Sequence, residues 1–282
     1  MMLRDCLISG FADEINRDFG VQLKTLQELG QKYIELRAAD GIGVADMTTE
    51  QAKGFHDRMS AAGIRVSAIG SPIGKIGITD DFEPHFEKFR HVVELAKLFD
   101  TQNIRMFSFY IPQGERPEDY REEVIRRLAR MKEYAEEHQV ILFHENEKGI
   151  YGDNAKRCLE LFEALAGEHF RCIFDFANFV QCKQDTLEAY RMLEPYIAYV
   201  HVKDALMADG EVVVAGEGDG HVAEIFGLLE KKQFQGFLSL EPHLTNFSGL
   251  ETLEASVRRK KEQDGIDAYK KAYGGLQKLL NL

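Results

Sequence analysis

The sequence predicts a single (β/α)8 barrel that extends over residues 1–282. Short apolar runs alternate with longer amphipathic segments, eight such runs occur, and no linker rich in proline, glycine or serine interrupts them. The runs recur roughly every 33 residues, a spacing typical of a repeating strand–helix unit. A doubly wound open sheet is the alternative. It is disfavoured because no predicted strand is followed by a GxGxxG or GxxxxGK[ST] turn.

The predicted strands are runs rich in apolar residues, many of them β-branched or aromatic. They occupy residues 6–11, 33–38, 66–71, 103–110, 140–146, 171–177, 197–204 and 237–243. The segments between them carry helix signals, such as a proline start at 117–138, an Asp or Asn cap at 153–165 and apolar spacing at 221–232. The chain from Leu250 onward is also predicted to be helical, with the charged RRKKEQD stretch at 258–264 as a solvated face.

The composition is that of a globular protein and disfavours several functions. The chain is 44 % apolar and 29 % charged, and it is long enough to bury a large core without disulfides. Its net charge of −12 disfavours nucleic acid and anionic membranes as partners, since basic surface drives both kinds of binding. The four cysteines lack zinc-ribbon spacing and are expected to be reduced thiols. With no signal-peptide pattern and no long apolar run, we expect a cytoplasmic protein.

Ionisable residues stand at the ends of the last four predicted strands. They are Glu145 in FHENE, Asp175 in FDFAN, His201 in HVKDA and Glu241 in LEPH. Alone, such an acid more often caps a helix, and such a histidine is more often a hydrogen-bonded core residue. Four on consecutive strands favour a common site, because strand ends converge at the active-site face of a barrel. One divalent ion would offset the three carboxylates, and this ligand set suits Mn²⁺, Mg²⁺, Co²⁺ or Zn²⁺.

Further polar residues near strand ends are candidates for binding a substrate. Strand alternation places Lys203 and His243 on the same face as the ionisable set, with a salt-bridged lysine and a loop histidine as the competing interpretations. His144 takes the opposite face and is expected to be structural. The other candidates near strand ends are Arg37, Arg105, Ser71 and Glu147, together with Glu35, Lys75 and Ser108.

The competing interpretation for Arg105 is a buried ion pair, and that for Lys75 is a solvated loop residue. The GEGDG stretch at 216–220 follows the seventh strand, where this fold often binds phosphate. A flexible turn is the competing interpretation, and the two acids in the stretch favour a substrate without phosphate.

With these residues in place, the chain resembles the xylose isomerase-like (β/α)8 barrel superfamily, and within it the sugar phosphate isomerase/epimerase group. The likeness covers nearly the whole chain. Members related to the tagatose/psicose 3-epimerases hold one divalent metal with a Glu, Asp, His, Glu set on strands five to eight. The resemblance therefore implies Glu145, Asp175, His201 and Glu241 as metal ligands, with the two glutamates also acting as acid and base. One departure is Asn178, where the epimerases have a histidine that helps to hold substrate, so the particular ketohexose is in doubt.

The implied function is a metal-dependent isomerase or epimerase that acts on a small carbohydrate (a sugar, sugar acid or sugar phosphate) through an enediolate. A dehydratase of an inosose-like cyclic polyol ketone shares the enolate chemistry and is the first alternative. An endonuclease IV-like nuclease is less favoured, because that class uses a three-zinc site with more histidines. A metal-free binding protein is the fourth possibility. A homodimer is common for such barrels, but no segment of the sequence marks an interface.

Overall fold

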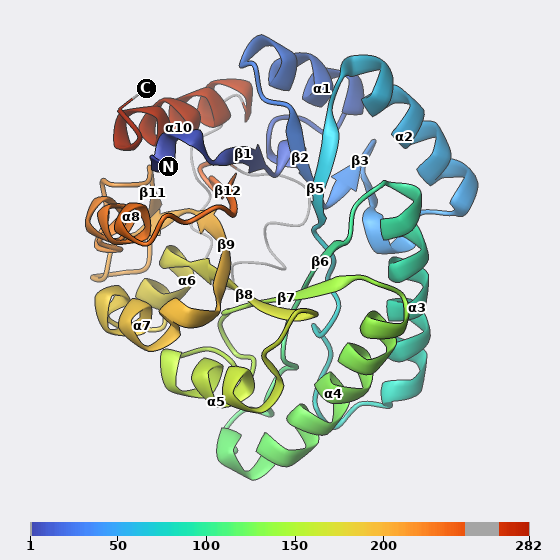
Figure 1. Ribbon diagram of the computed structural model, residues 1–282, viewed down its shortest axis with the longest axis vertical. Helices are drawn as coiled ribbons and strands as arrows, with labels where there is room; N and C mark the ends of the chain where they lie inside the picture. Colours follow the sequence, from blue (N-terminus) through green and yellow to red (C-terminus); the bar gives the residue numbers. More distant parts are fainter. Residues whose placement is uncertain (1, 246–264, 282) are drawn as a thin grey trace.

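Eight parallel strands form a nearly closed barrel in the computed structural model, which describes residues 2–245 and 265–281 (Figure 1). The order around the barrel is β1-β12-β9-β8-β7-β6-β5-β2, and β1 and β2, at the two ends of this order, are neighbours. The strands are β1 (Leu7–Gly10), β2 (Tyr33–Leu36), β5 (Arg65–Ile69), β6 (Asn103–Met106), β7 (Ile141–Glu145), β8 (Phe170–Asp175), β9 (Ile197–Val202) and β12 (Phe237–Leu240). The predicted (β/α)8 barrel is therefore confirmed.

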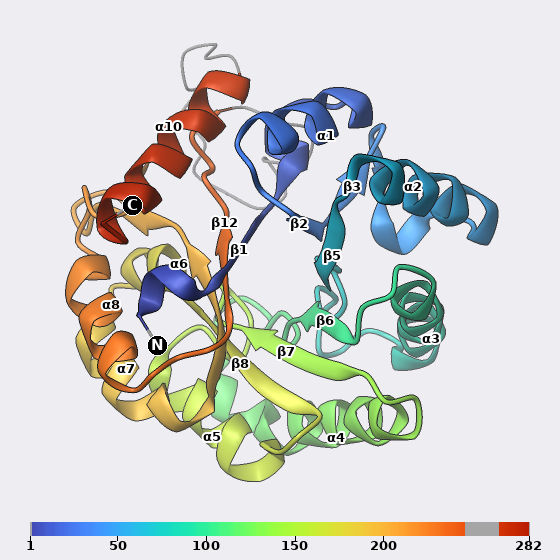
Figure 2. The ribbon, with the colours of Figure 1, turned by 45° about the horizontal axis from the view of Figure 1, so that its top comes forward.

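Helices surround the strands and cover the outside of the barrel (Figures 1 and 2). They are α1 (Phe19–Glu28), α2 (Thr49–Ala62), α3 (Phe82–Leu98), α4 (Arg121–Glu137), α5 (Ala155–Leu165), α6 (Phe176–Gln181), α7 (Thr186–Leu193), α8 (Val222–Lys231) and α10 (Gly265–Leu279). In both views α10 lies between α8 and α1, and its Tyr269 donates a hydrogen bond of 3.0 Å to Gln31. The predicted tail helix is present from residue 265, whereas the RRKKEQD stretch lies outside the described residues.

Short elements occupy the connections. The 3-10 helices are η1 (Leu3–Asp5), η2 (Ala12–Glu14), η3 (Val44–Asp46), η4 (Pro117–Tyr120) and η5 (Glu194–Tyr196). Two antiparallel pairs, β3 (Ala38–Ala39) with β4 (Ile42–Gly43) and β10 (Asp204–Ala205) with β11 (Val212–Val213), follow the ends of β2 and β9. These connections build the face of the barrel at which the parallel strands end.

The helix starts follow the predicted signals with shifts of a few residues. Asn154, and not Asp153, caps α5, since its side chain accepts a hydrogen bond of 2.9 Å from the backbone N–H of Arg157. The proline start predicted at 117 opens the 3-10 turn η4, and α4 follows it directly.

Several strands end earlier than predicted, for identifiable backbone reasons. The run 103–110 forms a strand only to Met106; beyond it, the backbone N–H groups of Phe107 and Phe109 bond to carbonyls of the loop 73–76, and Phe109 has a φ of 66°. The run 237–243 forms a strand only to Leu240; Pro242 lacks an N–H for the ladder, and His243 has a φ of 46°.

The apolar core lies mainly between the strands and the surrounding helices, with large side chains such as Phe89, Phe162 and Phe174 almost fully buried. His144 belongs to this outer layer, since its ring packs against Phe162 and Phe170, in agreement with the expected structural role. Among the described residues, no helix combines the length and the apolar character that crossing a membrane requires.

Candidate metal centre

The four ionisable residues at the ends of β7, β8, β9 and β12 meet at one point. Glu145 and Asp175 are the last residues of β7 and β8, His201 is the last but one of β9, and Glu241 follows β12. One ligand atom from each lies within 4.8 Å of the others, and all four side chains are buried. Asp175 and His201 are paired across β8 and β9, so the strand register itself places them side by side.

Local hydrogen bonds hold the two strand-end acids in place. The Asp175 carboxylate accepts a hydrogen bond of 2.7 Å from the backbone N–H of Asn178 and so caps α6, which begins at the residue after Asp175. Asn146 joins β7 to β8 by exchanging two 3.0 Å hydrogen bonds with the backbone of Asp175. Asn178 donates to Glu145 Oε1 at 3.2 Å. The position that carries histidine in the epimerases therefore supports a glutamate of the cluster in this chain.

Basic side chains offset the charge of the carboxylates. Lys203 Nζ lies 2.9 Å from Glu241 and 3.2 Å from Asp175, at only 3 % exposure. Arg105 lies 3.3 Å from Glu145 and 3.6 Å from Glu241. Both competing interpretations for these residues, the salt-bridged lysine and the buried arginine pair, describe contacts that the structure contains.

The shared charges shift the pKa values of the cluster in opposite directions. Burial raises the pKa of Glu145, but His201 and Arg105 outweigh this effect and lower it to about 2. Burial raises the pKa of Asp175 to about 7, with Glu145 and Glu241 adding to the rise and Lys203 opposing it. Burial raises the pKa of Glu241, but the charges of Lys203 and His243 outweigh burial and hold this pKa well below its ordinary value. Asp175 is therefore the carboxyl of the cluster that most needs another positive charge.

The donor set fits a divalent cation. Three carboxylates and one imidazole are ligands that hard and borderline divalent ions prefer. Asp175 Oδ2 is buried, and although Lys203 Nζ lies 3.2 Å away, this oxygen accepts no hydrogen bond within the described part of the chain. His201 turns Nδ1 toward the cluster, 3.1 Å from Glu145 and 3.6 Å from Glu241. Each of the four residues thus presents an atom at the same point, as a metal ligand must.

A second polar group adjoins the first and shares Glu241 with it. Glu14, Glu241 and His243 also have ligand atoms within 4.8 Å of one another. Arg37 lies among them, 3.1 Å from Glu14 and 3.1 Å from Glu241, and Asp13 holds the same guanidinium at 2.8 Å. Arg37 therefore already supplies a fixed positive charge to this group, and we assign the group to the support of Glu241.

Sequence reasoning did not identify Asp13 and Glu14. Both lie in η2, immediately beyond the end of β1, in the segment FADE. Their position just after a strand is the same signal that identified the four cluster residues. The missing information was that Arg37, at the end of β2, would point toward them.

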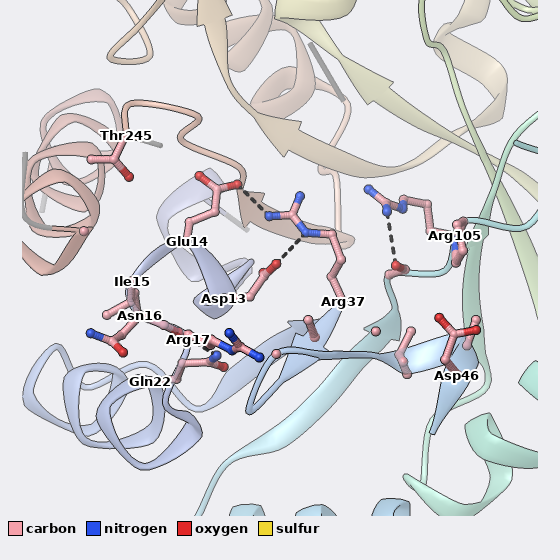
Figure 3. A pocket seen from close by; sticks show the side chains of 18 of the residues that line it. Asp13, Glu14, Ile15, Asn16, Arg17, Gln22, Arg37, Asp46, Arg105 and Thr245 are labelled. Carbon is pink, nitrogen blue, oxygen red and sulfur yellow. Dashed lines mark hydrogen bonds and ion pairs between the residues drawn. The ribbon is translucent and has the colours of Figure 1, made fainter. Parts of the chain in front are cut away.

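A cavity of about 660 Å³ opens beside the cluster, on the side of β1, β2 and β5 (Figure 3). Figure 3 shows Arg37 reaching toward Asp13 and Glu14, with Arg105 on the other side. Both arginines line the cavity and also contact the cluster glutamates. They form the boundary between the open space and the buried carboxylates.

The remaining predicted substrate-binding residues differ in their surroundings. Lys75 lines the cavity and pairs with Glu147 at 3.2 Å, so it is not a solvated loop lysine. His243 is buried with its Nε2 3.4 Å from Glu241. Ser71 is buried, and its hydroxyl donates a hydrogen bond of 2.5 Å to the backbone carbonyl of Arg105. This hydrogen bond helps to position the end of β6.

The glycine-rich stretch at 216–220 is organised by Asp204, a residue that sequence reasoning did not select. Its carboxylate accepts hydrogen bonds of 2.9–3.0 Å from the backbone N–H groups of Gly216, Gly218 and Gly220. These are the groups that a phosphate-binding loop would offer to a ligand. Because an internal carboxylate takes them, the stretch is built to hold its own shape.

Comparison with known proteins gives a family and a set of distant relatives. A family model described as "Xylose isomerase-like TIM barrel" matches residues 23–270. A curated protein of Bacillus anthracis named 3-dehydroshikimate dehydratase is 25 % identical over 134 residues, which is 48 % of this chain and 48 % of that protein. The match thus spans about half the length of that relative.

Solved structures resemble the whole chain at low identity. A structure of L-ribulose 3-epimerase has a TM-score of 0.76 at 19 % identity, over 98 % of this chain and 95 % of that one. A xylose isomerase-like TIM barrel protein from Mycobacterium smegmatis, in complex with magnesium, has a TM-score of 0.70 at 17 % identity, over 100 % and 99 % of the two chains. At these identities the likeness establishes the fold.

Proposed function

Because the chain belongs to the xylose isomerase-like TIM barrel family, we propose that it is a divalent-metal-dependent isomerase or epimerase of a small carbohydrate. In this proposal Glu145, Asp175, His201 and Glu241 hold one ion, with Mn²⁺, Mg²⁺, Co²⁺ and Zn²⁺ as the candidates. The observation that carries the proposal is the convergence of four buried ligand atoms within 4.8 Å, beside a cavity large enough for a sugar.

When bound, the ion supplies positive charge to a ketone and its neighbouring hydroxyl, which makes the C–H of the hydroxyl-bearing carbon more acidic. Glu145 and Glu241 then exchange protons with the substrate. Their lowered pKa values keep both deprotonated at neutral pH, so each is able to accept a proton. Glu145 removes the proton to give an enediolate, and Glu241, after taking a proton from His243, returns one to the substrate. Return from the opposite face inverts the carbon. Return at the next carbon, with the hydroxyl proton passing to the other oxygen, moves the carbonyl; proton exchange with water then restores Glu145 and His243.

The proton that Glu241 returns has a source in its neighbour His243. Burial and Lys203 lower the pKa of His243, but Glu14 and Glu241 outweigh them and raise it above the ordinary value. Its Nε2 lies 3.4 Å from Glu241, within reach of a proton transfer after a small movement. Lys203 and Arg105 place positive charge beside the site where the enediolate oxygens develop negative charge.

Substrate selection falls to the cavity. Its lining includes Arg37, Arg105 and Lys75, and the two arginines also contact the cluster glutamates. Each of these side chains is able to donate hydrogen bonds to hydroxyl or carboxylate oxygens. Asp204 occupies the backbone donors of the glycine-rich stretch, which supports a substrate without phosphate at that position.

Elemental analysis of the purified protein, followed by a panel of ketoses, inososes and sugar phosphates, tests the proposal. We expect a divalent metal near one equivalent per chain, and conversion of a ketose that chelation removes. Absence of bound divalent metal, together with no conversion after metal is added, would exclude the proposal and favour a binding protein.

A dehydratase is the second candidate, and the 25 % identical relative named 3-dehydroshikimate dehydratase is the observation that favours it. Dehydration begins with the same proton abstraction by a glutamate but ends in loss of a hydroxyl, so the product gains a conjugated double bond. The same panel, followed by ultraviolet absorbance, separates the two. An absorbance that grows with a cyclic polyol ketone assigns dehydration, whereas a new sugar without absorbance assigns isomerisation or epimerisation.

A further inference from the structure

Glu35 is a buried carboxylate inside the barrel, on β2, that the proposed chemistry does not use. Three side chains surround it. Two hydroxyls donate hydrogen bonds to its Oε2: Ser239 Oγ at 2.7 Å and the Tyr199 hydroxyl at 2.9 Å. His201 Nε2 lies 3.1 Å from Oε2 and 3.2 Å from Oε1. A buried side chain with this many directed contacts is held in one place.

The contact with His201 determines which nitrogen of the ring faces the cluster. Nε2 points at Glu35, a carboxylate that only accepts hydrogen bonds, so Nε2 must carry a hydrogen. Nδ1 points the other way, at Glu145, Glu241 and Asp175. Because Glu145 lies 3.1 Å from Nδ1, the same argument gives Nδ1 a hydrogen in the metal-free protein. A metal ion at the cluster would replace the hydrogen on Nδ1, whereas the hydrogen on Nε2 would stay in its contact with Glu35.

Resting on the proposed metal site, we infer that Glu35 is a positioning residue that fixes His201 with Nε2 protonated and Nδ1 available as the metal ligand. Carboxylates behind metal-bound histidines orient the ring, set its protonated nitrogen and increase its basicity, and their loss commonly weakens metal binding by about 10–100-fold. The hydroxyls of Ser239 and Tyr199 orient Glu35 in turn. The proposed site therefore includes the polar side chains inside the barrel that lie behind His201.

The test uses Glu35→Gln, which keeps the shape of the side chain but offers both a donor and an acceptor. Ser67→Ala is the matched control, because Ser67 belongs to the same layer and contacts Tyr199 at 2.9 Å without touching Glu35. We expect E35Q to weaken Mn²⁺ binding by about 10–100-fold, and S67A by less than about threefold, as measured by competition with a fluorescent chelator.

Nuclear magnetic resonance of protein labelled with ¹⁵N-histidine supplies a readout that does not depend on activity. In the metal-free protein we expect the Nε2–H proton of His201 to be shifted downfield and to exchange slowly, in the wild type and in S67A. In E35Q this signal should move upfield or disappear. With ¹¹³Cd²⁺ bound to the wild type, we expect coupling between cadmium and Nδ1.

Coupling of cadmium to Nε2, or a downfield Nε2–H signal that persists unchanged in E35Q, would overturn the inference. If E35Q does not fold, the two wild-type spectra still decide it, since a rapidly exchanging Nε2–H in the metal-free protein would also overturn it. A wild-type protein that binds no divalent ion contradicts the proposed function instead. In that case the metal-free spectra still show whether Glu35 holds Nε2.

Discussion

Glu145→Gln tests the centre of the proposed site, because it removes one charge and changes little else. The carboxylate contacts His201 Nδ1 at 3.1 Å, Asn178 at 3.2 Å and Arg105 at 3.3 Å. The amide keeps the size of the side chain but loses the ability to take a proton and to neutralise the two cations. Turnover, metal affinity and stability should therefore all change, each for its own reason.

The magnitude follows from the pKa shift. The pKa of Glu145 is lowered from 4.5 to about 2, so its surroundings favour the charged form by about 3 kcal/mol at 1.36 kcal/mol for each pKa unit. We expect the metal-free variant to lose roughly this free energy of unfolding, because His201 and Arg105 remain buried with one partner fewer. Loss of a general base should lower kcat by about 10²–10⁴-fold.

Three measurements check these values: urea unfolding of the chelated protein, Mn²⁺ affinity by competition, and kcat on the substrate that the panel identifies. Glu133→Gln is the control, since Glu133 is exposed on α4 and undergoes the same chemical change. An E145Q protein that turns over and binds metal like the wild type would refute the assignment of Glu145. Loss of folding in E145Q but not in E133Q would instead show that the residue is mainly structural.

Three further predictions concern acid stability, the glycine-rich stretch and the metal. Burial lowers the pKa of His85 from 6.5 to about 4, and the nearby charges of Lys88 and Arg127 add to this effect. As the pH falls, His85 is therefore protonated first in the unfolded chain. The stability that neutral His85 contributes is fully present above pH 6.5 and is lost as the pH falls toward 4. We expect H85Q to lose about 2–3 kcal/mol less than the wild type between pH 7 and 4.5 in urea unfolding, and an equal loss would contradict this. Asp204→Ala should cost about 3 kcal/mol or more, because three glycine N–H groups lose their acceptor, whereas Asp209→Ala in the exposed loop should cost under ~1 kcal/mol; similar melting temperatures for both would count against the role of Asp204. Chelation should abolish conversion and lower the melting temperature, with added Mn²⁺, Mg²⁺ or Co²⁺ restoring both, and activity that survives full chelation would remove the metal from the mechanism.

The barrel could be predicted because its strands are buried on both faces. Such strands appear in the sequence as apolar runs, and here amphipathic helical segments separate them. The ends of the strands were harder to place. The run from residue 103 keeps the same mixture of apolar and polar residues to Tyr110, so its composition does not reveal that β6 ends at Met106 or that Phe109 has a positive φ. Boundaries of this kind depend on backbone conformation, which tertiary packing selects.

The residues that meet at the centre were predictable for a similar reason. Glu145, Asp175, His201 and Glu241 interrupt apolar runs at the same point of successive units, and barrel geometry brings such points together. Their roles as ligands and as acid and base remain predictions.

The network around these residues could not be predicted in the same way. Arg37 contacts Glu241 across 204 residues of sequence, and Glu35 contacts His201 across 166. No local pattern encodes which buried side chain faces which, because that depends on how β2, β9 and β12 are placed relative to one another around the barrel.

The site is divided between two halves of the barrel. The proposed ligands come from β7, β8, β9 and the end of β12, whereas the cavity is formed mainly by the segments that follow β1, β2 and β5, including the β3–β4 pair. Arg37 and Arg105 belong to the cavity half but also contact the cluster glutamates, so changes at these two residues would reach the other half. A substitution in the segment 38–46 would instead reshape the space beside the cluster while leaving the proposed ligands in place. We therefore expect such a substitution to alter which ligand binds without altering the proposed chemistry.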